Sequence, residues 1–301
     1  MDLRPGPLAL RARHALRDAQ AQAVAAFVNV DPVDNLYVFC DPRGGGTWLT
    51  EAIAEVPRTA VMWEPLLERQ MPEWTHLGLG PRPALPEGAD RPETRAVLDR
   101  VFRGKALNRW SKGSDALTCV RADRLLIKVS RGNALLPWLT KQFPFRRPPV
   151  LLVRHPFAVV ASQLAWGAWS SLHDRANQDR TPEEALVQTW CTTTLQALRH
   201  ERCGTDWVPV FYEHLLQDPE REVERIFGRW EIRVPPSIYG RMGRASATTK
   251  EATFEDGAEA QLSKWQRALS PDQVARMRAV LEQYDVTEYG LSPLPTVALP
   301  A

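Results

Sequence analysis

The sequence predicts an α/β protein built on a parallel β-sheet of about five strands, flanked by helices on both faces. Two observations carry this prediction. Short apolar runs such as residues 36–40 (LYVFC) show no polar alternation, which is typical of strands buried on both faces. Helical patterns separate these runs along most of the chain, and such alternation favours parallel strands joined by crossover helices. The 301 residues suffice for one large domain, so we expect residues 1–301 to form one domain.

The elements follow from the pattern of apolar residues and breakers. Five strands are expected, at residues 36–40, 59–63, 124–129, 150–153 and 207–212. An opening helix is expected at about residues 8–28, ahead of a core that spans about residues 36–284. Further helices are expected from about residue 47 and at residues 92–102, 135–143, 156–166, 183–202, 220–230 and 271–284, the last capped by Ser270. Residues 71–91 are rich in Pro and Gly and predict a long surface loop.

Composition narrows the class of protein. The formal net charge is +2, which favours neither a nucleic-acid partner nor a membrane surface, while leaving room for a local basic site. Four cysteines occur without CxxC or zinc spacing, so they predict reduced thiols and no metal site. The first ten residues lack the apolar core of a secretory signal, and no stretch is apolar enough to span a membrane. We therefore expect a cytoplasmic location.

A glycine-rich segment, Asp41-Pro42-Arg43-Gly44-Gly45-Gly46-Thr47-Trp48, joins the first strand to its helix. Glycines let the backbone approach a ligand closely, and N–H groups at a helix N-terminus can hold an anion. Arg43 adds a forked cation and Thr47 a hydroxyl. The alternative is a plain tight turn. No Gly-Lys-Ser/Thr is present, so this segment is not a Walker A loop.

A second candidate site begins where the fourth strand ends. Arg154 closes the strand and faces the edge where ligands bind in such sheets, and Ser162 follows eight residues later in the next helix. These two side chains could hold one phosphate from two directions. The alternative pairs Arg154 with a carboxylate and Ser162 with its own helix backbone.

Together the two segments resemble the family of sulfotransferases that use 3′-phosphoadenosine 5′-phosphosulfate (PAPS). The first family signature is Pro-Lys/Arg-Ser-Gly-Thr/Ser-Thr-Trp after strand one, and the second is an Arg at a strand end with a Ser eight residues later. Residues 211–215 (FYEHL) with Asp218-Pro219 are similar to the family's Tyr-Glu-Asp-Leu segment. Trp265 with Leu269-Ser270-Pro271 is similar to a closing pattern of bacterial members. The resemblance covers about residues 36–284 and implies a P-loop-like fold.

The resemblance also implies where PAPS would bind. The implied donor contacts are Arg43, Gly44, Gly45, Gly46, Thr47 and Trp48 at the 5′-phosphosulfate, Arg154 and Ser162 at the 3′-phosphate, and Tyr212 at the adenine. Hydroxyls of Thr248 and Thr249 are expected near the nucleotide, although this stretch reads equally well as a solvated loop. No metal is implied.

Three residues are candidates for catalysis. By analogy, Arg43 stabilises the negative charge that develops on the leaving phosphate. Lys128, near the end of the third strand, supplies a second cation, or else is a strand-end lysine in an ion pair. Ser130 occupies the position of a catalytic His in the cytosolic branch of the family. The expected base is therefore Glu64, in a Trp-Glu-Pro-Leu run similar to the Phe-Glu-Pro-Leu run of carbohydrate sulfotransferases. The alternative is an orienting or structural carboxylate paired with Arg43 or Lys128.

The expected reaction is in-line transfer of a sulfuryl group to a hydroxyl of a sugar, lipid or small natural product, leaving adenosine 3′,5′-bisphosphate. The expected partner is a small-molecule or glycan acceptor. Trp63, Trp166 and Trp169 could line its pocket or serve as packing. Two alternatives stay open: a P-loop-type nucleotide kinase, against which the missing Walker lysine argues, and a non-catalytic nucleotide-binding module. The sequence fixes neither the acceptor nor the oligomeric state.

Overall fold

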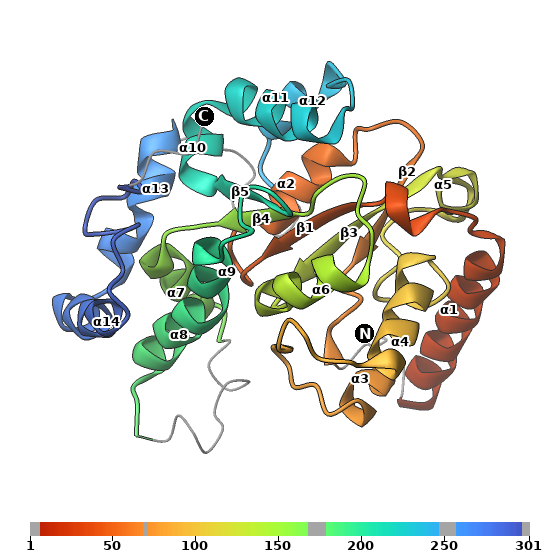
Figure 1. The fold of residues 1–301 in the computed structure, drawn as a ribbon, viewed down its shortest axis with the longest axis horizontal. Helices are drawn as coiled ribbons and strands as arrows, with labels where there is room; N and C mark the ends of the chain where they lie inside the picture. The colour runs from red at the N-terminus through yellow and green to blue at the C-terminus, as the bar shows by residue number, and fades with distance from the viewer. Residues whose placement is uncertain (1–6, 69–70, 168–178, 247–256, 297–301) are drawn as a thin grey trace, which may run out of the picture.

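The computed structural model describes residues 7–68, 71–167, 179–246 and 257–296 (Figure 1). At its centre lies a sheet of five strands: β1 (Leu36–Cys40), β2 (Thr59–Trp63), β3 (Arg124–Ser130), β4 (Val150–Val153) and β5 (Val208–Phe211). The order across the sheet is β2-β3-β1-β4-β5, and every neighbouring pair is parallel. The predicted five-stranded parallel sheet is therefore confirmed, and its strands lie within a residue or so of the predicted ranges.

Alternate residues of each strand enter two separate hydrophobic clusters. In β1, Leu36, Val38 and Cys40 belong to one cluster, and Tyr37 and Phe39 belong to the other. This alternation follows from the two-residue period of a strand. Burying an aliphatic or aromatic side chain of this size contributes about 1.5–3 kcal/mol, so both faces of the sheet stabilise the fold.

Helices cover both faces, as predicted (Figure 1). The first cluster is closed by α2 (Gly46–Ile53), α11 (Pro219–Trp230) and α12 (Ser237–Met242). The second is closed mainly by α4 (Pro92–Phe102), α6 (Leu136–Gln142), α7 (Pro156–Ala165), α8 (Pro182–Trp190) and α14 (Pro271–Gln283). The remaining α-helices are α1 (Pro7–Phe27), α3 (Pro72–His76), α5 (Ala116–Arg121), α9 (Gln196–Arg199), α10 (Tyr212–Gln217) and α13 (Gly257–Ala268).

Two expected segments differ from the structure. The loop expected at residues 71–91 contains the short helix α3. The helix expected at residues 183–202 is interrupted by a π-helical segment, η6 (Cys191–Leu195), between α8 and α9. Such wide turns often occur at functional sites. The predicted cap of α14 is confirmed, because Ser270 Oγ accepts a hydrogen bond from the backbone N–H of Gln273.

Among the helices in the described ranges, none combines the length and the apolar character that crossing a bilayer requires.

Candidate active site

The candidate residues follow the strands in the order of the sheet. Glu64 follows β2, Lys128 lies near the end of β3, Arg43 follows β1, Arg154 follows β4 and Tyr212 follows β5. Because parallel strands end at the same edge, residues that are far apart in the chain form one row. The row runs from the Glu64 carboxylate at one end to the Tyr212 ring at the other.

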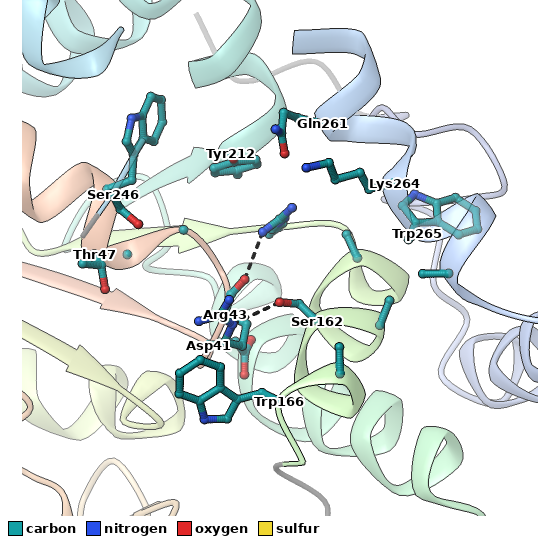
Figure 2. Close-up of a pocket in the computed structure, with 18 of the residues that line it drawn as sticks. Asp41, Arg43, Thr47, Ser162, Trp166, Tyr212, Ser246, Gln261, Lys264 and Trp265 are labelled. Atoms are coloured by element: carbon teal, nitrogen blue, oxygen red, sulfur yellow. Dashed lines mark hydrogen bonds between the residues drawn. The ribbon is translucent and has the colours of Figure 1, made fainter. Parts of the chain in front are cut away.

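A cavity of about 400 Å³ opens at this edge, and we call it the edge pocket (Figure 2). Most of the residues predicted from the sequence line it: Arg43, Gly45, Gly46, Thr47, Trp48, Lys128, Arg154, Ser162 and Tyr212. Three residues considered for the site, Gly44, Glu64 and Trp63, are not part of this lining. Thr248, Thr249 and Trp169 lie outside the described residues, so their predicted roles stay predictions.

The glycine-rich loop is tightly packed and needs its glycines. Gly45 is the N-cap of α2 with φ +91°, and a Cβ added there would lie 2.5 Å from the Tyr212 ring. A Cβ on Gly46 would lie 2.3 Å from the Cys40 sulfur. Contacts this short force either the loop or the contacted side chain to move, and the left-handed backbone at Gly45 also disfavours other residues. The loop thus brings the first N–H groups of α2 to the pocket, where they can bind an anion.

Arg43 contacts both Ser162 and Arg154, and its contact with Ser162 can be followed in Figure 2. Arg43 Nε donates to Ser162 Oγ at 3.0 Å, and Arg154 Nη1 donates to the backbone oxygen of Arg43 at 3.1 Å. The Arg154 guanidinium lies 4.4 Å from the centroid of the Tyr212 ring. Burial and the neighbouring charge of Arg154 lower the pKa of Arg43. Two cations held this close favour an anionic ligand, which would relieve their repulsion.

Glu64 and Lys128 form a partly buried ion pair at the other end of the row. Glu64 also accepts hydrogen bonds from the backbone N–H and the hydroxyl of Ser130, each at 2.7 Å. Burial lowers the pKa of Lys128, but the charge of Glu64, the neighbouring Cys40 and the hydrogen bond to Glu64 together outweigh burial, so this pKa lies above its ordinary value. Of the pairings left open by the sequence, Glu64 with Lys128 is therefore the one observed. The backbone of Glu64 has φ +46°, a strained conformation that is frequent at functional sites.

Asp41, just before the glycine-rich loop, is held by a network that the sequence did not indicate. Its carboxylate pairs with Arg82 Nη1 at 3.1 Å and accepts a hydrogen bond from the Thr194 hydroxyl. Thr194 belongs to the π-helical segment η6, and it also accepts from the side-chain amide of Asn133 at 2.8 Å. The buried Asp41 thus ties the glycine-rich loop to residues 71–91 and to the helix interruption.

Helix α13 supplies four lining residues, Gln261, Lys264, Trp265 and Ala268, of which only Trp265 was singled out from the sequence. Gln261, Lys264 and Trp265 share one face of the helix because they are three and four residues apart. Figure 2 shows Gln261 and Lys264 near Tyr212, at the opposite end of the pocket from Trp166. Lys264 adds a fourth basic side chain to the lining, beside Arg43, Lys128 and Arg154. The same-face spacing was the signal available in the sequence, where only Trp265 was noted.

Comparison with known proteins places this arrangement in a fold class. No protein-family model matches the chain, and no curated protein matches it significantly. Among solved structures, the sulfotransferase domain from the curacin biosynthetic pathway superposes with a TM-score of 0.50 at 17% identity, over 83% of this chain and 97% of that domain. The sulfotransferase domain of the Synechococcus PCC 7002 olefin synthase matches with a TM-score of 0.49 at 18% identity, over 88% of this chain and 97% of that domain.

A mouse sulfotransferase complexed with PAP matches more distantly, with a TM-score of 0.44 at 10% identity, over 89% of this chain and 90% of that one. The likeness to the curacin-pathway domain shows that this chain has the sulfotransferase fold. That fold fits the family to which the sequence motifs point.

Proposed function

We propose that this protein is a sulfotransferase that uses PAPS as donor and an alcohol as acceptor. The observation that carries the proposal is the edge pocket itself. A helix N-terminus, the contacting residues Arg43, Ser162 and Arg154, and the Tyr212 ring meet in one cavity of a sulfotransferase fold. A nucleotide that carries two separate anionic groups and an adenine matches this set of groups.

The residues proposed to bind PAPS form two sets, one for each of its anionic groups. The α2 N-terminus with Gly45, Gly46 and Thr47 would hold the 5′-phosphosulfate, and Arg154 with Ser162 would hold the 3′-phosphate. The Tyr212 ring, which already carries Arg154 on its face, would pack against the adenine. Each hydrogen bond to a charged group contributes about 1.5–3 kcal/mol, so a few of them give a useful affinity.

In the proposed reaction, the acceptor oxygen forms a bond to sulfur while the bond from sulfur to the bridging phosphate oxygen breaks. Negative charge moves to the leaving phosphate, where Arg43 and Lys128 would stabilise it more in the transition state than in the ground state. The acceptor proton would go to Glu64, whose carboxylate is held in place by Lys128 and Ser130. A base in this role contributes about 10²–10⁴ in rate.

The acceptor is proposed only as a class: a hydroxyl on a sugar, a lipid or a small natural product. Trp166 supports an acceptor with a flat or apolar face. This residue is 60% exposed and lines the edge pocket, and its ring centroid lies 4.8 Å from the Arg43 guanidinium carbon. Transfer of radiolabelled sulfate from PAPS to a panel of phenols, glycosides and long-chain alcohols would test this class.

Thermal stabilisation by adenosine 3′,5′-bisphosphate, compared with ATP and 5′-AMP, tests the donor. A ligand at 100 times its Kd stabilises the folded state by about 2.7 kcal/mol, which gives a clear rise in Tm. We expect selective stabilisation by the bisphosphate and its loss in Arg154→Ala. An equal shift with magnesium ATP would instead support a nucleotide kinase, and turnover with no loss in Arg154→Ala would contradict the proposed donor site.

A further inference from the structure

Three residues that line the edge pocket are each followed in the sequence by a buried residue: Arg154 by His155, Tyr212 by Glu213, and Lys264 by Trp265, which itself also lines the pocket. The three buried residues come from the start of α7, the start of α10 and the face of α13. They meet one another and Tyr289, near the C-terminus. We call His155, Glu213, Trp265 and Tyr289 the hub.

Glu213 connects three segments of the hub. One of its carboxylate oxygens accepts a hydrogen bond from the backbone N–H of His155 at 2.8 Å, and the other accepts from the Tyr289 hydroxyl at 2.9 Å. Glu213 is 1% exposed, and burial raises its pKa. Hydrogen bonds to a carboxyl group this deeply buried are costly to lose, because water cannot replace them. Glu213 therefore fixes the end of β4 to the end of β5 and to the C-terminal segment.

His155 connects the same C-terminal segment to α13. Its Nδ1 accepts from the backbone N–H of Phe157, so the proton of the neutral ring lies on Nε2. Nε2 lies 3.1 Å from the backbone oxygens of both Gly290 and Ser292. The imidazole stacks on the Trp265 ring with centroids 4.9 Å apart and planes 24° apart. The helix that carries Gln261 and Lys264 is thus packed onto the residue next to Arg154.

We propose that the hub positions the donor site, and that residues 289–292 belong functionally to that site although none of them lines the edge pocket. The proposal rests on the proposed function. Arg154, Tyr212 and Lys264 are each joined by one peptide bond to a hub residue. A shift of that hub residue therefore moves the pocket residue next to it. Such a shift would disturb most the 4.4 Å stack of Arg154 on Tyr212, because the two residues follow different strands. Tyr289, Glu213 and His155 are accordingly positioning residues, which act on the ligand through Arg154, Tyr212 and Lys264.

Tyr289→Phe is the direct test, because it removes one hydroxyl and leaves a Glu213 oxygen without its donor. Tyr284→Phe is the matched control: Tyr284 is also near the C-terminus, and its hydroxyl contacts only Gln188, at 3.4 Å, among the hydrogen bonds of the described residues. The measurement is the Kd for adenosine 3′,5′-bisphosphate by calorimetry, well below the Tm of each variant. We expect Tyr289→Phe to weaken binding about tenfold and Tyr284→Phe to leave it unchanged. In turnover, the KM for PAPS should rise with kcat nearly constant.

A purely structural hub would lower the Tm of Tyr289→Phe while its Kd stayed equal to that of the unmodified protein, and this result would overturn the proposal. Should Tyr289→Phe fail to fold, His155→Asn provides the second variant. Asn keeps a capping side chain for α7 but loses the stack on Trp265 and the contacts to residues 290 and 292. We expect weaker binding there too, and an unchanged Kd would overturn the proposal. If the unmodified protein does not bind the bisphosphate, the proposed function fails instead, so the two failures are distinguishable.

Discussion

Arg43 and Ser162 are 119 residues apart in the sequence, yet Arg43 Nε donates a hydrogen bond to Ser162 Oγ at 3.0 Å. The two residues belong to different motifs, one after β1 and one within α7. Their contact brings the glycine-rich loop and the first turns of α7 around one point of the edge pocket. Both groups are hydrogen-bond donors to an anion, so a phosphate at this point would take the place of their mutual contact.

Ser162→Ala should therefore weaken the binding of adenosine 3′,5′-bisphosphate by about tenfold, because one hydrogen bond to a charged group is lost. The Tm without ligand should change little, since Ser162 is only partly buried. Ser263→Ala is a suitable control, because Ser263 Oγ bonds to carbonyls of its own helix α13. Calorimetric titration of both variants checks the prediction, and equal affinities would show that Ser162 does not contact the ligand.

Glu64→Gln should lower kcat by about 10²–10⁴ and leave the affinity for adenosine 3′,5′-bisphosphate within about twofold. The amide keeps the size of the side chain but cannot take the acceptor proton. Single-turnover rates and equilibrium binding separate these two effects. Ser130→Ala removes one hydrogen bond to Glu64 and should cost far less in rate. If both variants lost rate equally, Glu64 would be an orienting residue and not the base.

Gly45→Ala should abolish nucleotide binding and lower stability. The added Cβ would lie 2.5 Å from the Tyr212 ring, and φ +91° is unfavourable for alanine. Gly240→Ala is the control, because Gly240 lies in α12 with no heavy atom within 4 Å of the added carbon. Alanine in that helix should stabilise the protein by about 0.5–1 kcal/mol. Thermal unfolding with and without the bisphosphate would show both effects, and a Gly45→Ala protein with normal binding would refute the packing argument.

Acid should destabilise the protein through His155, whose pKa burial lowers to about 4. In the unfolded chain a histidine titrates near 6.5, so between pH 6.5 and 4 the unfolded state binds a proton that the folded state excludes. The stabilisation is complete above pH 6.5 and falls by about 3 kcal/mol as the pH drops to 4. His155→Asn should show a flatter decline over this window. Urea unfolding at pH 7, 5.5 and 4 measures the difference in stability between the unmodified protein and His155→Asn. The raised pKa of Glu213 has the opposite effect on stability, but it acts in both proteins and cancels in the difference.

The strands were predictable because each is a short, mostly apolar run, and the two flanking clusters bury all of it except end residues of β2 and β3. Most of the candidate site was predictable for a related reason: parallel strands place their carboxyl ends at one edge. Five helices in the described part of the chain were not predicted. Four of them, α3, α5, α10 and α12, have five or six residues, which do not complete two turns of a periodic pattern. The fifth, α13, has twelve residues and was missed. The strand order was also beyond the sequence, since pairing partners leave no local signal.

The missed parts of the site are long-range contacts between polar residues. The pairing of Asp41 with Arg82 joins positions 41 residues apart, and no local pattern in the sequence marks Arg82 as the partner of Asp41. The π-helical segment that contains Thr194 also has no local signal in the sequence, because its extra residue is accommodated by tertiary packing. His155 directly follows the strand-end Arg154 in the sequence. Its place as the buried cap of α7 depends on the C-terminal residues 290 and 292, which no local pattern links to it.

The sheet order β2-β3-β1-β4-β5 puts Glu64 and Lys128 on the outer two strands of one side, and Arg154 and Tyr212 on the other side. Arg43 stands between the two groups. Under the proposed function, the base that removes the proton and the residues that bind the nucleotide therefore lie in different loops. A substitution in the loop after β2 would then change proton removal without altering any residue proposed to hold the nucleotide.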